Sequence, residues 1–186
     1  MTEPDGGAGD RAVAPDGATA RDRAAAPGRA VALRPAQPDD AAAVADIWRS
    51  GWHDGHRGLV PDALVTVRTD ASFAERAAQR VDDTTVAVVD GAVAGFVMVV
   101  DDEVEQVYVA GDHRGAGVAD VLLRAAERQV AANGQHRAWL AVVAGNARAR
   151  GFYERMGWRD EGPFDYAAEG PEGPIAVPCH RYVKAV

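Results

Sequence analysis

The sequence predicts a single α/β domain in which a mixed β-sheet is flanked by helices. Short apolar runs typical of strands alternate with stretches in which apolar residues recur at helical spacing. Read in order, these elements are β-α-α-β-β-β-α-β-α-β-β, and no internal repeat is present. A chain of 186 residues with 47% hydrophobic residues is long enough to bury one core.

Composition excludes several classes of protein. The net charge of -8 argues against a nucleic-acid or membrane-surface partner, because both need clustered Lys and Arg. Cys179 is the only cysteine, so an internal disulfide is impossible and a cysteine zinc site is not expected. No apolar run approaches the roughly 18 residues of a membrane span, and the N-terminus lacks the pattern of a secretion signal. We therefore expect a cytoplasmic protein without a metal.

The chain divides into a tail and a domain. Residues 1–30 consist mostly of Ala, Gly, Pro, Asp and Arg, which bury too little surface to offset the entropy of ordering. We expect a disordered tail there, either a dispensable extension or a partner-binding arm. The folded domain is expected over residues 31–186.

The first elements are a strand and two helices. Residues 31–35 form a short strand that ends at a proline, and Asp39 or Asp40 is the expected N-cap of the first helix. One face of that helix repeats at helical spacing through Val44, Ile47, Trp48 and Gly51. A loop or broken helix is expected over 51–61, and a second helix over 72–81.

The middle of the chain is a strand hairpin and a third strand. Asp90-Gly91 is a strong turn signal between strands over 84–89 and 92–100. Asp101-Asp102 connects tightly to a strand over 103–109. The remaining predicted elements are a helix over 117–132 that ends at Asn133-Gly134, a strand over 139–144, a helix over 146–156, a strand over 158–164, a loop over 167–174 and a strand over 175–184.

The most informative segment is the connection between the strand over 103–109 and the helix that follows it. Gly115 and Gly117 lie in this connection, directly before the helix. A helix N-terminus presents unpaired N–H groups and a partial positive charge, and glycines let those groups converge on an anion. The segment therefore predicts a phosphate or pyrophosphate site. Neither the P-loop spacing nor the G-x-G-x-x-G dinucleotide pattern is present.

Two motifs resemble one known family. Arg114-x-x-Gly117-x-Ala119 is similar to the R/Q-x-x-G-x-G/A signature of GNAT acyltransferases. The family's second motif, N-x-x-A-x-x-F-Y-E-x-x-G-F, is matched, with Trp as the last aromatic, by Asn146, Ala149, Phe152, Tyr153, Glu154, Gly157 and Trp158. The motifs occur in the right order on matching elements, and the resemblance covers residues 31–184.

The resemblance implies a GNAT-like fold with a splayed central sheet and acetyl-CoA as co-substrate. The pyrophosphate would be held by the backbone of the glycine loop, which comprises Arg114, Gly115, Ala116, Gly117, Val118 and Ala119. A bulge in the strand over 103–109 would expose the edge around Val107 and Val109 to the thioester carbonyl and the pantetheine amides. Asn146 would contact the pantetheine arm, and Tyr153 would be the general acid that protonates the leaving thiolate.

Two carboxylates are candidates for the general base. Alternation along the strand puts Glu103 and Glu105 on the same face as Val107 and Val109, provided that the bulge does not shift the count. Either glutamate could deprotonate or bind the amine, or both could simply solvate a turn. A family branch that acetylates ribosomal proteins carries a glutamate where Ala141 stands here, so that branch is disfavoured.

The acceptor is expected to contact the segment after the first helix. Trp52, His53 and His56 are the candidate substrate-binding residues there, although a solvated loop explains them equally well. Cys179 is not expected to be a nucleophile, because adjacent His180 points to the opposite face of its strand.

The resulting functional hypothesis is an N-acetyltransferase that transfers the acetyl group of acetyl-CoA directly to a primary amine in a ternary complex. The acceptor would be a small molecule or a peptide, and the acidic residues favour a cationic one. The alternatives are a non-catalytic acyl-CoA-binding sensor or scaffold, and a nucleotide-binding regulator. Homodimers are common in the family, so a homodimer is expected.

Overall fold

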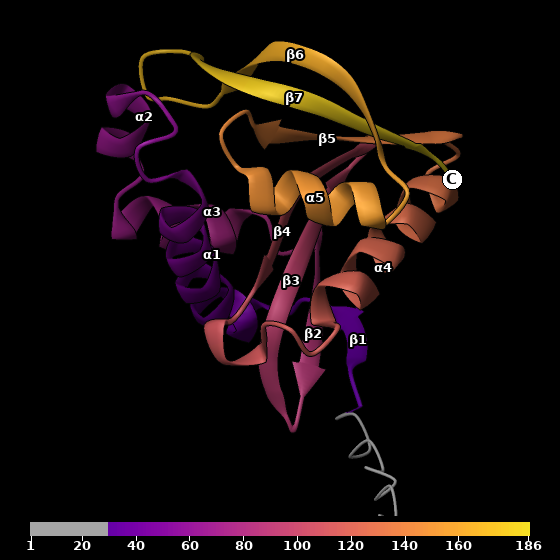
Figure 1. Ribbon diagram of the computed structural model, residues 1–186. Helices are drawn as coiled ribbons and strands as arrows, with labels where there is room; N and C mark the ends of the chain where they lie inside the picture. The colour runs from indigo at the N-terminus through magenta and orange to yellow at the C-terminus, as the bar shows by residue number, and fades with distance from the viewer. Residues whose placement is uncertain (1–29) are drawn as a thin grey trace, which may run out of the picture.

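The computed structural model describes residues 30–186, so the predicted tail lies, apart from Ala30, outside the described residues. Its centre is a seven-stranded sheet in the order β1-β2-β3-β4-β5-β7-β6 (Figure 1). The pair β4–β5 is parallel, and the other neighbouring strands are antiparallel. Helices cover this mixed sheet, which confirms the predicted fold class.

The elements follow the expected order closely. The strands are β1 (Ala32–Pro35), β2 (Thr84–Val89), β3 (Ala92–Val100), β4 (Glu103–Val109), β5 (Arg137–Val143), β6 (Arg159–Ala168) and β7 (Ile175–Ala185). The helices are α1 (Ala41–His56), α2 (Asp62–Val67), α3 (Asp70–Gln79), α4 (Val118–Ala132) and α5 (Ala147–Arg155), with short 3-10 turns η1 (Pro38–Asp40) and η2 (Gly111–His113). None of these helices in residues 30–186 has the length and apolar character needed to span a membrane.

Two hydrophobic clusters lie on opposite faces of the sheet. On one face, α4 buries Leu122 and Leu123 against residues such as Val97 of β3. On the other face, Trp48 of α1 and Phe73 of α3 pack together with Phe96 of β3. Successive residues of β3 therefore contribute alternately to the two clusters. Because both faces of this strand are covered, its central residues are all buried and apolar.

The sheet is split between β4 and β5. Backbone pairing between them is confined to Glu103 and Trp139. The indole of Trp139 also donates to Asp102 Oδ1 at 3.0 Å, and its backbone N–H donates to the Asp102 carbonyl at 2.9 Å. These contacts tie the strands together at one end, beyond which they diverge.

A β-bulge in β4 accompanies the split. Gln106 pairs with Met98 and Val104 pairs with Val99, so Glu105 is an extra residue without an opposite partner in β3. An extra residue shifts the alternation of side chains by one position. The bulge expected in this strand is therefore present and does shift the count, so Glu103 and Glu105 do not share a face with the valines at 107 and 109.

The first helix is longer than predicted. It continues through Gly51 to His56, whereas a loop or broken helix was expected from residue 51. Position 51 of this helix is a glycine because the ring of Tyr108 packs directly on it. A Cβ there would lie 2.3 Å from Tyr108 Cδ1. The short helix α2 was not predicted. Asp40 is the N-cap residue of α1, as predicted, but its carboxylate makes no capping hydrogen bond to α1 and instead pairs with Arg34 at 2.6 and 2.8 Å.

Candidate active site

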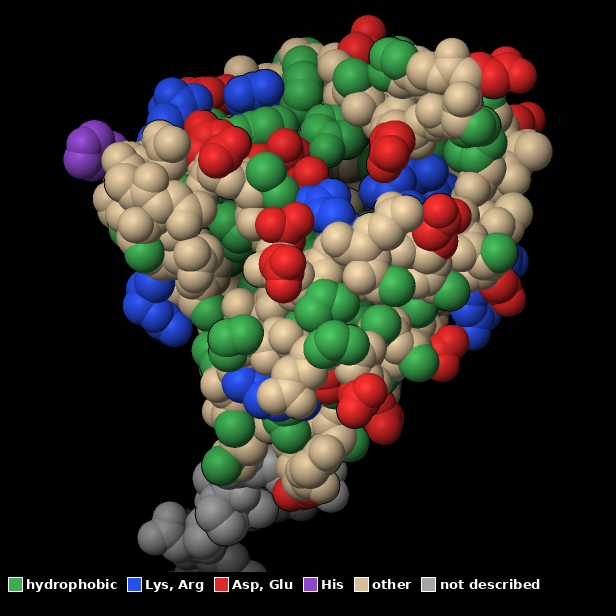
Figure 2. Space-filling model, turned by 180° about the vertical axis from the view of Figure 1, so that it is seen from behind, with side chains coloured by type: hydrophobic (Ala, Val, Ile, Leu, Met, Phe, Trp, Pro, Cys, Tyr) green, Lys and Arg blue, Asp and Glu red, His purple; other side chains and the backbone are tan. Residues whose placement is uncertain are grey.

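A cleft of about 780 Å³ opens where β4 and β5 diverge. One end lies at the N-terminus of α4, and the other end lies among α1, α3 and the strands β6 and β7. Figure 2 shows the molecule from behind, where acidic and basic side chains lie next to one another around a hollow below the β6–β7 hairpin. Mixed charge of this kind suits a polar ligand better than a uniformly charged polymer.

The glycine loop forms the first end of the cleft. Gly115 and Gly117 have φ of 80° and 81°, a conformation that other residues rarely adopt, and the space beside each Cα is open. The backbone N–H groups of Val118, Ala119 and Asp120 have no acceptor in the described part of the chain. These three residues line the cleft, so their N–H groups are available to a ligand anion.

The other two loop residues differ in what they contact. Arg114 lines the cleft and forms an ion pair with Asp54 of α1 at 2.7 Å, which joins the loop to the last turns of that helix. Its Nε also donates to the Val109 carbonyl at 3.4 Å. Ala116 is exposed and does not line the cleft, and its backbone N–H donates to the His113 carbonyl at 3.4 Å, so it is not placed to bind the anion.

Asn146 lines the cleft and joins two helices. Its Oδ1 accepts from the Ala149 N–H at 3.1 Å and so caps α5. Its Nδ2 donates to the Gly55 carbonyl of α1 at 3.3 Å. Sequence reasoning identified the residue but not this bridge, because its partner lies 91 positions earlier in the chain.

Tyr153 of α5 contributes a hydroxyl group to the cleft. Its ring packs against Phe152, Trp158 and Tyr182, with centroid separations of 5.3, 6.2 and 6.0 Å. Its hydroxyl has no hydrogen-bond partner within residues 30–186 and is not sealed from the cleft. Burial raises the pKa of Tyr153 to about 12, so the phenol keeps its proton at neutral pH.

Glu103 has the most perturbed carboxyl group in the cleft. Burial raises its pKa from 4.5 to about 7, and the negative charges of Glu105 and Asp102 act in the same direction. A hydrogen bond from Tyr166 and the positive charge of Arg181 oppose the rise. A carboxyl group with such a pKa can exchange a proton near neutral pH.

Glu105 is more firmly engaged than Glu103. The bulge turns it toward α3, where it forms an ion pair with Arg80 at 2.7 Å. Val107 and Val109 instead pack with the cluster that contains α4. The geometry thus brings Glu103 and Glu105 to the α1–α3 side of the sheet and the two valine side chains to the other side, while all four residues line the cleft.

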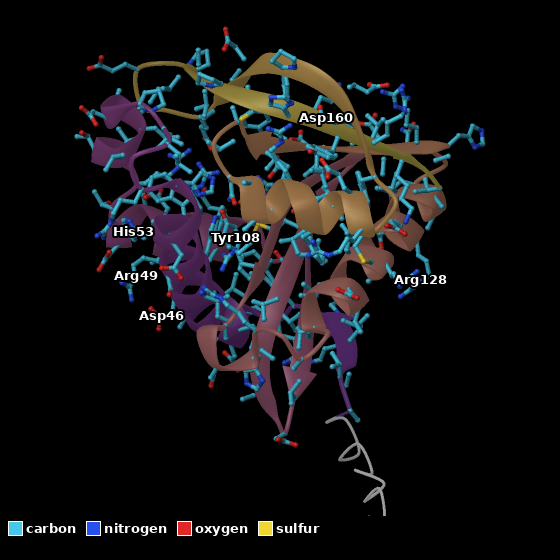
Figure 3. The ribbon with its side chains drawn as sticks, viewed as in Figure 1. Asp46, Arg49, His53, Tyr108, Arg128 and Asp160 are labelled. Carbon is cyan, nitrogen blue, oxygen red and sulfur yellow. The ribbon has the colours of Figure 1, made fainter. Side chains whose placement is uncertain are left out.

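The three candidate substrate-binding residues lie in the last turns of α1, and only two of them reach the cleft. Trp52 and His56 line the cleft and stack at a centroid distance of 5.1 Å. The Nδ1 atom of His56 lies 2.9 Å from the Trp52 carbonyl, and burial lowers the pKa of this imidazole. His53 does not line the cleft; it packs beside Phe73 and lies along the outer edge of α1 in Figure 3.

Several cleft residues were missed by sequence reasoning. Tyr108 lies in the interior beside α1 (Figure 3), and burial raises the pKa of its phenol. Tyr166 of β6 and the arginines Arg68 and Arg76 also line the cleft. No local motif marks these residues, because the fold gathers them from β4, β6 and the segment that contains α2 and α3.

Cys179 also lines the cleft, but its thiol is a poor nucleophile. Burial and the charge of Asp165 raise its pKa to about 11, so the thiolate is scarce at neutral pH. His180 binds Asp160 instead, at 2.8 Å from Nδ1 to Oδ2. Over residues 30–186, no three His, Cys, Asp or Glu side chains come together as metal ligands.

Comparison with known proteins supports the family resemblance that the two sequence motifs indicated. The family model for the acetyltransferase (GNAT) family matches residues 38–158. Solved structures with the same fold include a GCN5-related N-acetyltransferase from Rhodopseudomonas palustris, with a TM-score of 0.65, 22% identity and coverage of 83% of this chain and 95% of that one. No curated protein sequence matches.

Two further structures of this fold contain the coenzyme. The PaiA N-acetyltransferase from Thermoplasma acidophilum, in complex with coenzyme A, has a TM-score of 0.63, 15% identity, and coverage of 84% of this chain and 99% of that one. YncA from Salmonella typhimurium, with acetyl-CoA, has a TM-score of 0.61, 20% identity, and coverage of 84% and 94%. The family match extends from η1 through α5 and includes the glycine loop. The chain therefore belongs to the acetyltransferase (GNAT) family.

Proposed function

We propose that the protein is an N-acetyltransferase that moves the acetyl group of acetyl-CoA directly to a primary amine of a small molecule or peptide. One observation carries this proposal. A carboxyl group with a pKa of about 7, Glu103, and an unpartnered phenol, Tyr153, line the same cleft as an open helix N-terminus. A protein that only bound an acyl-CoA would need the helix N-terminus but neither of the other two groups.

The residues at the first end of the cleft fit acetyl-CoA. The free N–H groups of Val118, Ala119 and Asp120 suit its pyrophosphate, and a side chain at Gly115 or Gly117 would project into the open space that the phosphates need. The divergence of β4 from β5 leaves backbone groups near Val107 and Val109 for the amides of the pantetheine arm. When bound, acetyl-CoA supplies an acyl group activated as a thioester.

Three side chains of the protein have distinct proposed tasks. Glu103 accepts a proton from the acceptor ammonium group, directly or through water, because its pKa lies near neutral pH. Tyr153 holds a proton at Oη that it can donate to a leaving thiolate. Glu105 is a weaker candidate for the base, because the ion pair with Arg80 holds its carboxylate.

The acceptor end has aromatic walls from Trp52 and His56, which supports contact with the body of the acceptor. His53 lies outside those walls, which weakens the earlier hypothesis that it binds substrate. The homodimer expected from the family resemblance stays a prediction, and gel filtration with light scattering would test it.

Calorimetric titration with acetyl-CoA, with ATP as the control, tests the cofactor assignment. We expect micromolar binding of acetyl-CoA that ATP does not match. Release of free CoA thiol in the presence of a panel of amines then tests transfer. Binding without release to any amine supports the non-catalytic sensor, and the absence of binding contradicts the enzyme proposal. Tighter binding of ATP than of acetyl-CoA supports the nucleotide-binding regulator instead.

A further inference from the structure

Two arginines line the acceptor end of the cleft and have no task in the chemistry proposed above. Arg68 directly follows α2, and Arg76 lies on α3. The guanidinium group of Arg76 lies over the ring of Trp48, 5.2 Å from its centroid. The two helices thus bring two positive charges to one wall of a half-enclosed site.

Protein groups satisfy these guanidinium groups only in part. Arg76 donates from Nη1 to Glu169 Oε2 at 2.9 Å, but its Nε is buried without an acceptor in the described chain. Arg68 donates from Nη2 to the backbone carbonyl of Glu169 at 3.0 Å. Among residues 30–186, no carboxylate forms an ion pair with Arg68, and Glu169 itself is 77% exposed. Within the described residues, the two guanidinium groups therefore have one paired carboxylate between them, which binds Arg76 and is solvated.

This arrangement leaves the positive charge of Arg68 and Arg76 only partly compensated. Burial lowers the pKa of Arg68, and repulsion from Arg76 lowers it further. Arg80, on the same wall, differs because Asp83 and Glu105 each bind it at 2.7 Å. A partly buried guanidinium group is normally paired, and its planar donors suit a carboxylate held by two hydrogen bonds. A ligand anion would supply this counter-charge.

Tyr166 relates the arginine pair to the proposed base. Tyr166 lines the cleft together with Arg68, Arg76 and Glu103, and its phenol hydrogen-bonds to Glu103. Both arginines contact Glu169, three residues after Tyr166 in the chain. A ligand whose anion meets the arginines and whose amine meets Glu103 therefore carries both groups and spans this end of the cleft.

We propose that the acceptor is a free amino acid, whose carboxylate is bound by Arg68 and Arg76 while its amine faces Glu103. This inference rests on the proposed N-acetyltransferase function and narrows its substrate class. It adds a bound carboxylate to the expectation of a cationic amine, which followed from the acidic residues of the sequence alone. Peptide N-termini are disfavoured, because their first carboxyl group is an amide.

The first experiment compares ligands on the unaltered protein. Saturated with free CoA, which cannot react, the protein is screened by thermal shift with the twenty L-amino acids and their amides. The best pair, together with the decarboxylated amine, is then titrated by calorimetry. We expect the amino acid to bind about 10- to 100-fold more tightly than its amide, as for the loss of a charge-assisted pair. If none of the amino acids binds more tightly than its amide, the proposal is overturned.

Variants locate the carboxylate site. Arg68→Gln should weaken amino-acid binding about 10-fold or more while changing amide binding less than about 2-fold, and Arg68→Lys should be intermediate. Arg49→Gln is the matched control, since Arg49 lies along the outer edge of α1 away from the cleft (Figure 3). Equal losses for amino acid and amide in Arg68→Gln contradict the assignment.

The two proposals fail in different ways. If CoA binds and amines are acetylated but amino acids have no advantage over their amides, only the amino-acid inference is wrong. If neither CoA nor acetyl-CoA binds, the proposed function fails first. Amino-acid binding that survives in Arg68→Gln and in Arg76→Gln would show that the carboxylate lies elsewhere, and the inference would be withdrawn.

Discussion

Replacement of Glu103 by glutamine should change the pH dependence of stability in a direction opposite to that of most carboxyl groups. The folded protein raises the pKa of Glu103 from 4.5 to about 7, so it binds this proton more tightly than the unfolded chain does. The free energy of unfolding of the wild type must therefore fall as pH rises from about 4.5 to about 7. Glutamine removes the ionisation and with it this loss.

The magnitude follows from the same pKa. A rise from 4.5 to about 7 corresponds to at most about 3.4 kcal/mol, at about 1.36 kcal/mol for each tenfold change in proton affinity. Because the carboxyl group is partly exposed to the cleft, solvent screening reduces this to about 1–2 kcal/mol. We expect Glu103→Gln to gain that amount over the wild type between pH 4.5 and pH 8.

Urea unfolding at a series of pH values measures this difference. The groups that face Glu103 are Tyr166, Glu105, Asp102 and Arg181, and all of them remain in the variant. Glu75→Gln, on the exposed side of α3, is the control and should track the wild type. A gap that stays constant, or that shrinks as pH rises, would refute the assignment of a raised pKa. The same variant should lose the ascending limb of the kcat/KM profile near pH 7.

Three further changes test other parts of the site. Gly117→Glu should abolish CoA binding by filling and charging the anion site, whereas Gly134→Glu, with a similar φ of 84° at the far end of α4, should retain it in calorimetry. Tyr153→Phe removes a hydroxyl without a protein partner, so turnover should fall at least about 10-fold with the thermal midpoint and acetyl-CoA affinity nearly unchanged; unchanged turnover would remove its acid role. Gly51→Ala should destabilise the fold by about 1–3 kcal/mol in urea, because its Cβ would meet Tyr108 at 2.3 Å, and Tyr108→Leu should partly restore stability.

The sequence predicted most elements because their signals are local. Helical spacing identified α4 and α5, and Asp90-Gly91, with φ of 52° and 83°, formed the expected turn. Gly51 led to the incorrect prediction of a loop, because a glycine usually weakens a helix. Its presence is explained by the ring of Tyr108, which is distant in sequence but packs on it. The family match and the shared fold confirmed the resemblance based on the two motifs.

The parts of the site that sequence reasoning missed depend on long-range geometry. The family resemblance predicted a bulge in β4, but its position at Glu105 is visible only in the register between β3 and β4. This one extra residue places the glutamates on the other face from Val107. Arg68 and Arg76 meet Glu169 across 101 and 93 positions of the chain. No local pattern links residues at such separations, so their shared wall required the structure.

The divergence of β4 and β5 also has a consequence for how the molecule unfolds. Because backbone pairing at this junction is confined to Glu103 and Trp139, the sheet is in effect two smaller sheets held together by side-chain packing. Each smaller sheet has its own hydrogen-bond ladder. We therefore expect the backbone amides of β1–β4 and those of β5–β7 to exchange with solvent as two separate groups, each with its own protection. A ligand that lies between β4 and β5 contacts both smaller sheets and so links them. Its binding should make unfolding more cooperative as well as raise the melting temperature.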